Sequence, residues 1–201
     1  MIQAGLHIHT TFSSDSSILP KTLVERLVAS KTAQAAAITD HDTVAGCSVI
    51  RKLASTYPNI LIIPGVEIST QQGDIVILGT EELPPQPWTA ENVVDFARST
   101  GSVSIAAHPY REYGMGDQTR NYKFDAVETL NGCSSNSAND AAKDLAKQMG
   151  LPGVAGSDAH QTSELFSVHS KIQASLDLDE ILKAIREGLV SIPSKQKSTR
   201  F

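Results

Sequence analysis

The sequence predicts an α/β fold in which a mostly parallel sheet curves into a barrel. Short apolar segments alternate with stretches of helical periodicity along the chain, and these segments are apolar on both faces, as parallel strands covered by helices are. Six of them end in side chains that bind metals, and five of the six histidines lie at such ends. An open sheet concentrates function at one switch point, whereas a barrel collects residues from the C-terminal end of every strand. The distribution of these side chains therefore favours the barrel.

The expected strands are short apolar runs bounded by polar residues, glycine or proline. In order they cover 2–6, 35–38, 61–63, 66–70, 74–78, 103–107, 125–130, 153–155, 166–174 and 190–192. The run 74–78 is expected to be a hairpin partner or an extra strand beside 66–70. The segments 81–87 and 110–122 are rich in proline, glycine or mixed charge and are expected to be loops.

The expected helices have recognisable starts and stops. Pro20 suits a first helical position, and apolar residues recur after it at helical spacing. A second helix is expected over 44–55. Thr89 is a good N-cap for the third, which Gly101 would end. Asn139 is expected to begin a helix over 141–149, and the last is expected over 179–187.

Length and composition limit the possible functions. With 201 residues the chain is expected to form one domain over 1–193, followed by a polar tail at 194–201. The net charge of −5 argues against a surface that coats a polyanion, so long nucleic acid is not expected as a partner. No apolar run reaches membrane-spanning length and the N-terminus does not look like a signal peptide, so we expect a cytoplasmic protein without a membrane partner. Cys47 and Cys133 form no CxxC motif and are expected to be reduced.

Three motifs carry most of the chemical information. In His7-Ile8-His9 both imidazoles point to the same side of an extended segment and can hold one cation, although such a pair is as often a surface feature. The motif 39–42 places Asp, His and Asp directly after apolar residues, and its other interpretation is a helix cap. Glu67 lies inside an apolar strand, where a carboxylate needs a cation or a proton.

Mixed imidazole and carboxylate ligands suit zinc, manganese or iron, whereas calcium and magnesium prefer oxygen ligands alone. Ions that share bridging carboxylates lie about 3.5–4 Å apart and lower the pKa of a bridging water. The resulting hydroxide attacks an electrophile whose oxygens bind the same ions, and a phosphate ester fits this arrangement. No G-x-S-x-G elbow and no glycine-rich phosphate loop is found. The sequence therefore predicts a phosphoesterase with two or three divalent ions and a metal-bridging hydroxide as nucleophile.

The same motifs resemble the PHP family, named for polymerase and histidinol phosphatase, almost from end to end. The matching stretches are 6–10, 12–15, 38–43, 65–69, 107–109, 127–132 and 156–160. Each stretch is unspecific alone, and together they are highly specific. The resemblance implies a distorted seven-stranded (β/α) barrel, similar to a TIM barrel, and a trinuclear metal site that hydrolyses phosphoesters.

The resemblance also implies eight metal ligands in three groups. One ion would be bound by His7, His9, Glu67 and Asp158, with Glu67 bridging to a second ion that also binds His108. A third would be bound by Asp15, His41 and His160. Without the resemblance, Asp15 is better interpreted as part of a serine-rich turn. Asp158, His160 and His41 are the residues expected to carry protons during catalysis.

The chain departs from the family pattern at two places. Gly5 stands where the family usually has Asp, so His7 would lack a partner that orients it. Some branches place a histidine on the second ion from the segment after Glu128, where this chain offers only asparagines. The second ion would therefore be partly occupied or lost, and Asn131 would instead contact the substrate.

The substrate is expected to be a small phosphate monoester or a nucleotide. Arg111, three residues after His108, is the cation expected to bind its phosphate, while Arg120 and Lys123 are better interpreted as solvated loop charges. Two alternatives remain. An amidohydrolase-type deaminase or amidase also begins with H-x-H and ends with Asp on a barrel, and a non-catalytic accessory PHP module would have lost ligands.

Overall fold

The computed structural model describes residues 1–193; the expected tail at 194–201 lies outside the described residues. The strands are β1 (Ile2–Gly5), β2 (Ala35–Ala37), β3 (Leu61–Ile63), β4 (Gly65–Thr70), β5 (Gly73–Leu78), β6 (Val103–Ala106), β7 (Ala126–Asn131), β8 (Gly153–Gly156), β9 (Ser170–Ile172) and β10 (Val190–Ser191). The helices are α1 (Pro20–Ala29), α2 (Ala45–Ala54), α3 (Ala90–Ser99), α4 (Asn136–Met149) and α5 (Leu178–Arg186), with a 3-10 helix at Gly116–Asn121.

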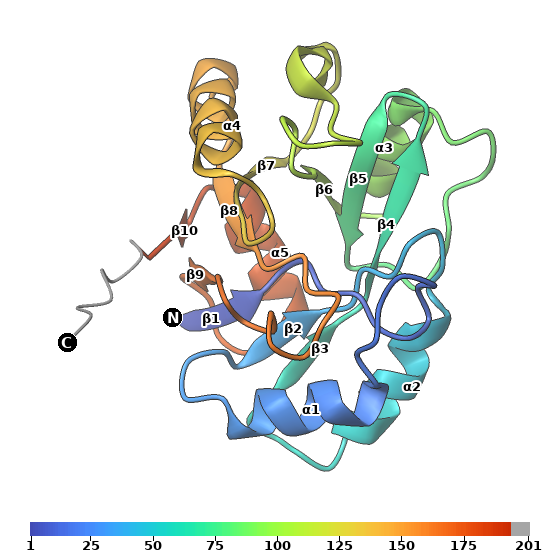
Figure 1. The fold of residues 1–201 in the computed structure, drawn as a ribbon, viewed down its shortest axis with the longest axis vertical. Coiled ribbons are helices and arrows are strands. Elements are labelled where there is room, and N and C mark those ends of the chain that lie inside the picture. Colours follow the sequence, from blue (N-terminus) through green and yellow to red (C-terminus); the bar gives the residue numbers. More distant parts are fainter. Residues whose placement is uncertain (194–201) are drawn as a thin grey trace.

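The strands form two five-stranded sheets, in the orders β10-β9-β1-β2-β3 and β4-β5-β6-β7-β8 (Figure 1). β1, β2 and β3 are parallel, as are β6, β7 and β8, whereas β5 runs antiparallel to both β4 and β6. β9 is antiparallel to its neighbours β1 and β10. The mixed α/β class is therefore confirmed, with more antiparallel pairing than expected.

The continuous seven-stranded barrel is not what the structure shows. Within residues 1–193 the two sheets pair with each other only through the isolated bridges Ile8–Ala159 and His41–Glu67. The chain passes from β3 directly into β4 through Pro64, whose nitrogen has no hydrogen to donate to a strand ladder. β3, with three residues, is also short, and the backbone hydrogen bonding does not continue from one sheet to the next.

Both sheets nevertheless bury one face in a shared core. Side chains alternate between the two faces of a strand, so Val76 and Leu78 of β5 enter the shared core while Ile75 and Ile77 pack against α3. The core also takes in residues of α5, including Ile181. α1 and α2 cover the outer face of β2 and β3, and α4 packs against β7 (Figure 1). Polar side chains occupy the end of the shared core at which β1, β2, β6 and β8 finish.

Several element boundaries differ from expectation. α4 begins at Asn136, five residues before the expected start at 141, because Ser135 and not Asn139 is its N-cap and accepts a hydrogen bond from the Ala138 N–H at 3.1 Å. Only Ser170–Ile172 of the expected strand 166–174 pairs with a neighbour. The Thr89 cap is confirmed by a 3.2 Å hydrogen bond from the Asn92 N–H. None of the helices within 1–193 is long and apolar enough to cross a membrane.

Candidate metal centre

The expected ligands converge on one cavity of about 630 Å³ at the end of the shared core. Its wall includes Asp15, His41, Glu67, His108, Asp158 and His160. His7 and His9 lie behind this wall and are fully buried. The residues come from the ends of β1, β2, β6 and β8 and from the middle of β4, so positions 150 residues apart in the chain become neighbours, as the hydrogen bond from the Ser157 hydroxyl to the His7 carbonyl shows.

The deepest group contains His7, His9, Glu67 and Asp158, all buried. Glu67 Oε2 is 2.9 Å from His7 Nε2 and 3.1 Å from His9 Nε2. Asp158 Oδ1 is 3.5 Å and 3.3 Å from the same two nitrogens. The four side chains thus direct their ligand atoms at one point, as the resemblance implies for the first ion.

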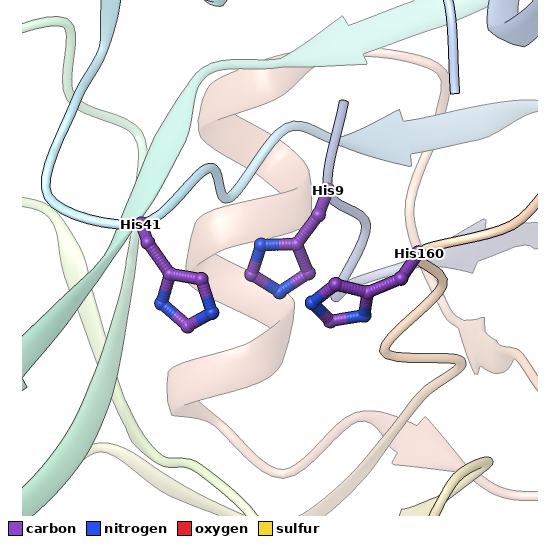
Figure 2. Close-up of side chains that lie close together, drawn as sticks. All are labelled: His9, His41 and His160. Atoms are coloured by element: carbon purple, nitrogen blue, oxygen red, sulfur yellow. The ribbon is translucent and has the colours of Figure 1, made fainter. Parts of the chain in front are cut away.

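A second group lies nearer the mouth of the cavity. Figure 2 shows His9, His41 and His160 side by side, with the His9 ring centroid 4.4 Å from that of His41 and 4.2 Å from that of His160. Asp15 Oδ2 lies 3.2 Å from His160 Nε2 and 3.5 Å from His41 Nε2. The expected trio of Asp15, His41 and His160 is therefore brought together, and His9 is an added member.

The third group contains Glu67, His108 and a residue that the sequence reasoning missed. Glu67 Oε1 is 3.1 Å from His108 Nε2, and Asp74 Oδ2 is 4.0 Å from the same nitrogen. Asp74 is buried at the start of β5. A carboxylate that opens an otherwise apolar strand is the sequence signal that would have found it.

Glu128 supplies the orienting contact that Gly5 lacks. Its Oε1 is 3.1 Å from His7 Nδ1, which leaves His7 Nε2 directed at Glu67. Its Oε2 accepts hydrogen bonds from the His108 N–H at 2.9 Å and from Asn131 Nδ2 at 3.0 Å. Glu128 thereby orients the His7 imidazole and holds the backbone of His108, so it contacts residues of two different ligand groups.

Asn131 and Arg111 behave differently from each other. The Asn131 amide donates to Glu128 and, at 3.2 Å, to Asp158, and its oxygen accepts from the Cys133 N–H at 2.9 Å. Because these contacts use the amide within the wall, Asn131 supports the site and does not reach the cavity. Arg111 does line the cavity and donates to the Asp158 carboxylate. Arg120 pairs with Asp117 and Gln148 outside it.

The electrostatics of the cluster follow from burial and neighbouring charges. Burial opposes protonation of His7 and His9, but nearby carboxylates outweigh it; the His7 pKa is raised well above its usual range and that of His9 to about 9. Burial also opposes ionisation of Glu67 and Asp158, yet the imidazoles hold both pKa values below their usual range. Burial, reinforced by Glu67, raises the pKa of Asp74 to about 6.

The residues present fit divalent cations. Within the site, His9 Nε2, His41 Nδ1 and His108 Nδ1 are buried and have no hydrogen-bond partner; the 3.1 Å approach of His9 Nε2 to Glu67 lacks hydrogen-bond geometry. Buried nitrogens without partners are costly unless another group satisfies them. For His9, which belongs to two groups, a cation shared with the carboxylates satisfies that need. Mixed nitrogen and oxygen donors suit a first-row divalent metal.

Sequence comparisons agree with this site. The profile of a family described as PHP-associated matches residues 136–190. The uncharacterized protein MJ1587 of Methanocaldococcus jannaschii is 30% identical over 142 residues, which are 65% of this chain and 82% of that protein. The 5′-3′ exoribonuclease Rnm of Salmonella typhimurium is 46% identical over 77 residues, 37% of this chain and 26% of Rnm.

Three solved structures share the fold. An amidohydrolase from Chromobacterium violaceum has a TM-score of 0.69 at 17% identity, covering 96% of this chain and 98% of that one. A protein from Bifidobacterium adolescentis that is described as a metal-dependent phosphoesterase has a TM-score of 0.63 at 15% identity, covering 78% of this chain and 87% of that one. Endonuclease Q, in complex with a DNA duplex containing an abasic lesion, has a TM-score of 0.65 at 14% identity, covering 92% and 56%.

These similarities correct one expectation. Long nucleic acid was not expected as a partner, on the basis of net charge, and that expectation is wrong: an exoribonuclease and a DNA-bound endonuclease are among the similar proteins. Net charge averages over the whole surface and therefore does not report on a local site for a phosphodiester. With the matched profile and the extended similarity to MJ1587, the comparisons establish that the chain belongs to the PHP family.

Proposed function

We propose that this chain is a metal-dependent phosphoesterase whose substrate is a small phosphate monoester or a nucleotide, either free or at the end of a nucleic acid. One observation carries the proposal: three groups of imidazoles and carboxylates meet at a single cavity. When bound, the ions supply Lewis acidity and lower the pKa of a water. The similarity to the Bifidobacterium protein and to Rnm supports the same chemistry.

The chain's own side chains then have separate tasks. Among the described residues, Arg111 is the one Lys or Arg that lines the cavity, and it follows His108 by three residues in the chain. We therefore assign it to bind a phosphate oxygen. His41 and His160 are partly exposed to the cavity, with 30% and 23% of their side chains accessible. They and Asp158 are the residues that we assign to moving protons between water and the leaving group.

A nucleotide fits the rim of the cavity better than a bare sugar phosphate. Tyr113 lines the rim and is 73% exposed, so its ring is open to a planar partner. Base stacking on an aromatic side chain contributes about 1–3 kcal/mol and tolerates any base. Tyr113→Ala is therefore expected to raise KM for nucleotides about tenfold or more, and to leave KM for a small aliphatic monoester unchanged. Tyr57→Ala, which removes an exposed tyrosine outside the cavity lining, is the matched control.

The deciding experiment is a substrate panel on metal-free protein reconstituted with zinc, manganese or iron. It should include small phosphate monoesters, mononucleotides, single-stranded oligonucleotides and, for the amidohydrolase alternative, amides. We expect phosphate release that chelation abolishes. His41→Ala and Glu67→Ala should lose turnover while retaining a cooperative melting transition. Turnover that survives exhaustive chelation, or hydrolysis of amides alone, would overturn the proposal.

A further inference from the structure

Asp74 lies beside two expected ligands of the second ion. Ligand atoms of Glu67, Asp74 and His108 all lie within 4.8 Å of one another, and the three residues are buried. The asparagines after Glu128 do not reach this group: Asn131 is engaged with Glu128 and Asp158, and Asn139 bonds the Asn131 backbone. Asp74 therefore occupies the role that the sequence left open at this position.

The backbone holds this group in place without help from a ligand. β4 and β5 pair in regular antiparallel register from Gly65 to Thr70, which sets Asp74 opposite Ser69 and two residues along from Glu67. The Asp74 N–H donates to the Tyr113 carbonyl at 2.9 Å, and its carbonyl accepts from the Ala107 N–H at 3.3 Å. Asp74 is thus fastened to the two segments on either side of His108, so the three ligands are positioned together.

The group has a different donor set from the other two. It offers two carboxylates and one imidazole, whereas the deepest group has two of each and the group at the mouth has three imidazoles. Two buried carboxylates close together need a compensating positive charge unless one of them takes up a proton. Arg111 does not supply it, because its guanidinium is paired with Asp158. Oxygen-rich sites suit manganese and magnesium, and imidazole-rich sites suit zinc.

We propose that Asp74 is a direct ligand of the second cation and that, with Glu67 and His108, it makes this position retain manganese when zinc fills the histidine-richer positions. The inference rests on the metal-dependent function proposed above. It predicts a mixed-metal centre whose members are set by the ratio of carboxylate to imidazole at each position. It also replaces the expectation that the second ion is partly occupied or lost.

Metal binding without substrate tests this inference. The test uses metal-free wild type, Asp74→Asn, Asp74→His and the control Asp117→Asn, which changes an exposed carboxylate of the 3-10 helix. Each is loaded with about two equivalents of zinc per chain, because excess zinc would fill every position, and is then titrated with manganese. Free manganese is followed by its EPR signal and total metal by elemental analysis. Wild type and Asp117→Asn should bind one manganese per chain that Asp74→Asn binds at least tenfold more weakly, since loss of even an indirect partner of a metal ligand costs ~10–100-fold. Asp74→His should exchange that manganese for zinc.

The outcomes separate this inference from the proposed function. Equal manganese number and affinity in wild type and Asp74→Asn, with both variants melting cooperatively, would overturn the role of Asp74 whatever the enzyme hydrolyses. A manganese that depends on Asp74 in a protein that hydrolyses no phosphoester would sustain this inference and overturn the proposed function. Unchanged metal preference in Asp74→His would overturn the selectivity argument, because the donor set would then not determine the ion.

Discussion

Replacing Glu128 with Gln tests whether this residue, which contacts expected ligands but does not line the cavity, controls metal binding. The carboxylate accepts three hydrogen bonds: from His7 Nδ1 at 3.1 Å, from the His108 N–H at 2.9 Å and from Asn131 Nδ2 at 3.0 Å. Gln has the same shape but turns one oxygen into an NH₂ group. Whichever way the amide is oriented, a donor then faces a donor. His7 loses its fixed tautomer, or His108 and Asn131 lose their acceptor.

The expected size follows from these contacts. Loss of a partner that orients a metal-ligating histidine lowers metal affinity ~10–100-fold, which corresponds to about 1.4–2.7 kcal/mol. A buried donor left without an acceptor costs a further ~1–3 kcal/mol of folding free energy. We therefore expect Glu128→Gln to bind its weakest ion at least tenfold less tightly and to unfold at lower urea concentration than wild type.

The assay is competition for zinc and manganese against a chromophoric chelator, with urea unfolding followed by circular dichroism. The matched control is Glu91→Gln, which makes the same substitution at an exposed position in the first turn of α3. It should leave the metal affinities and the urea unfolding curve unchanged. If correctly folded Glu128→Gln bound every ion with wild-type affinity, the orienting role of Glu128 would be refuted. The explanation of how His7 is oriented although Gly5 replaces the usual Asp would then fail as well.

Three further predictions follow from the same geometry. In Gly156→Ala the added Cβ would lie 2.2 Å from Glu128 Oε1 and 2.4 Å from His7 Cβ, so we expect about 1–3 kcal/mol of destabilisation in urea and reduced metal content by elemental analysis; wild-type values for both would contradict this contact. The metal-free protein should lose thermal stability as pH rises from about 6.5 through about 9, because the His9 pKa is raised when folded and its stabilisation, complete below the unfolded pKa, disappears as it deprotonates; a melting temperature constant over that range in chelator would contradict it. Arg111→Lys keeps the charge but loses the forked guanidinium, so KM for a phosphate ester should rise about tenfold with unchanged metal content; an unchanged KM in initial-rate kinetics would exclude Arg111 from substrate binding.

The sequence was most informative where the chain obeys a simple directional rule. Ligands such as His9, His108 and Asp158 follow apolar strands, and parallel strands bring such positions to the same end of a fold. Asp74 escaped this rule because β5 runs antiparallel to β4 and β6. Its first residues, and not its last, therefore lie at the end where the neighbouring strands finish.

The sequence also did not predict the break between the two sheets or the role of residues such as Glu128, which contact a metal ligand without binding the metal. The reason here is different. Whether β3 pairs with β4 depends on backbone geometry around Pro64, which apolar periodicity does not encode. The role of Glu128 depends on a side chain reaching His7 across 121 positions of sequence. Such contacts are set by packing, since any residue pair at that separation is possible before the chain is folded.

The division into two sheets has a consequence for how the molecule holds together. His7, His9 and His41 follow strands of the first sheet, while Glu67, Asp158 and His160 belong to or follow strands of the second. A cation shared by these ligands would connect the two sheets, whose backbones are otherwise paired through two isolated bridges. Because the two equilibria are coupled, a change that separates the sheets lowers the affinity for the ion, and a saturating ion suppresses separation of the sheets. Amide exchange at the Ile8–Ala159 and His41–Glu67 crossings should therefore slow on metal loading far more than exchange at the centre of either sheet.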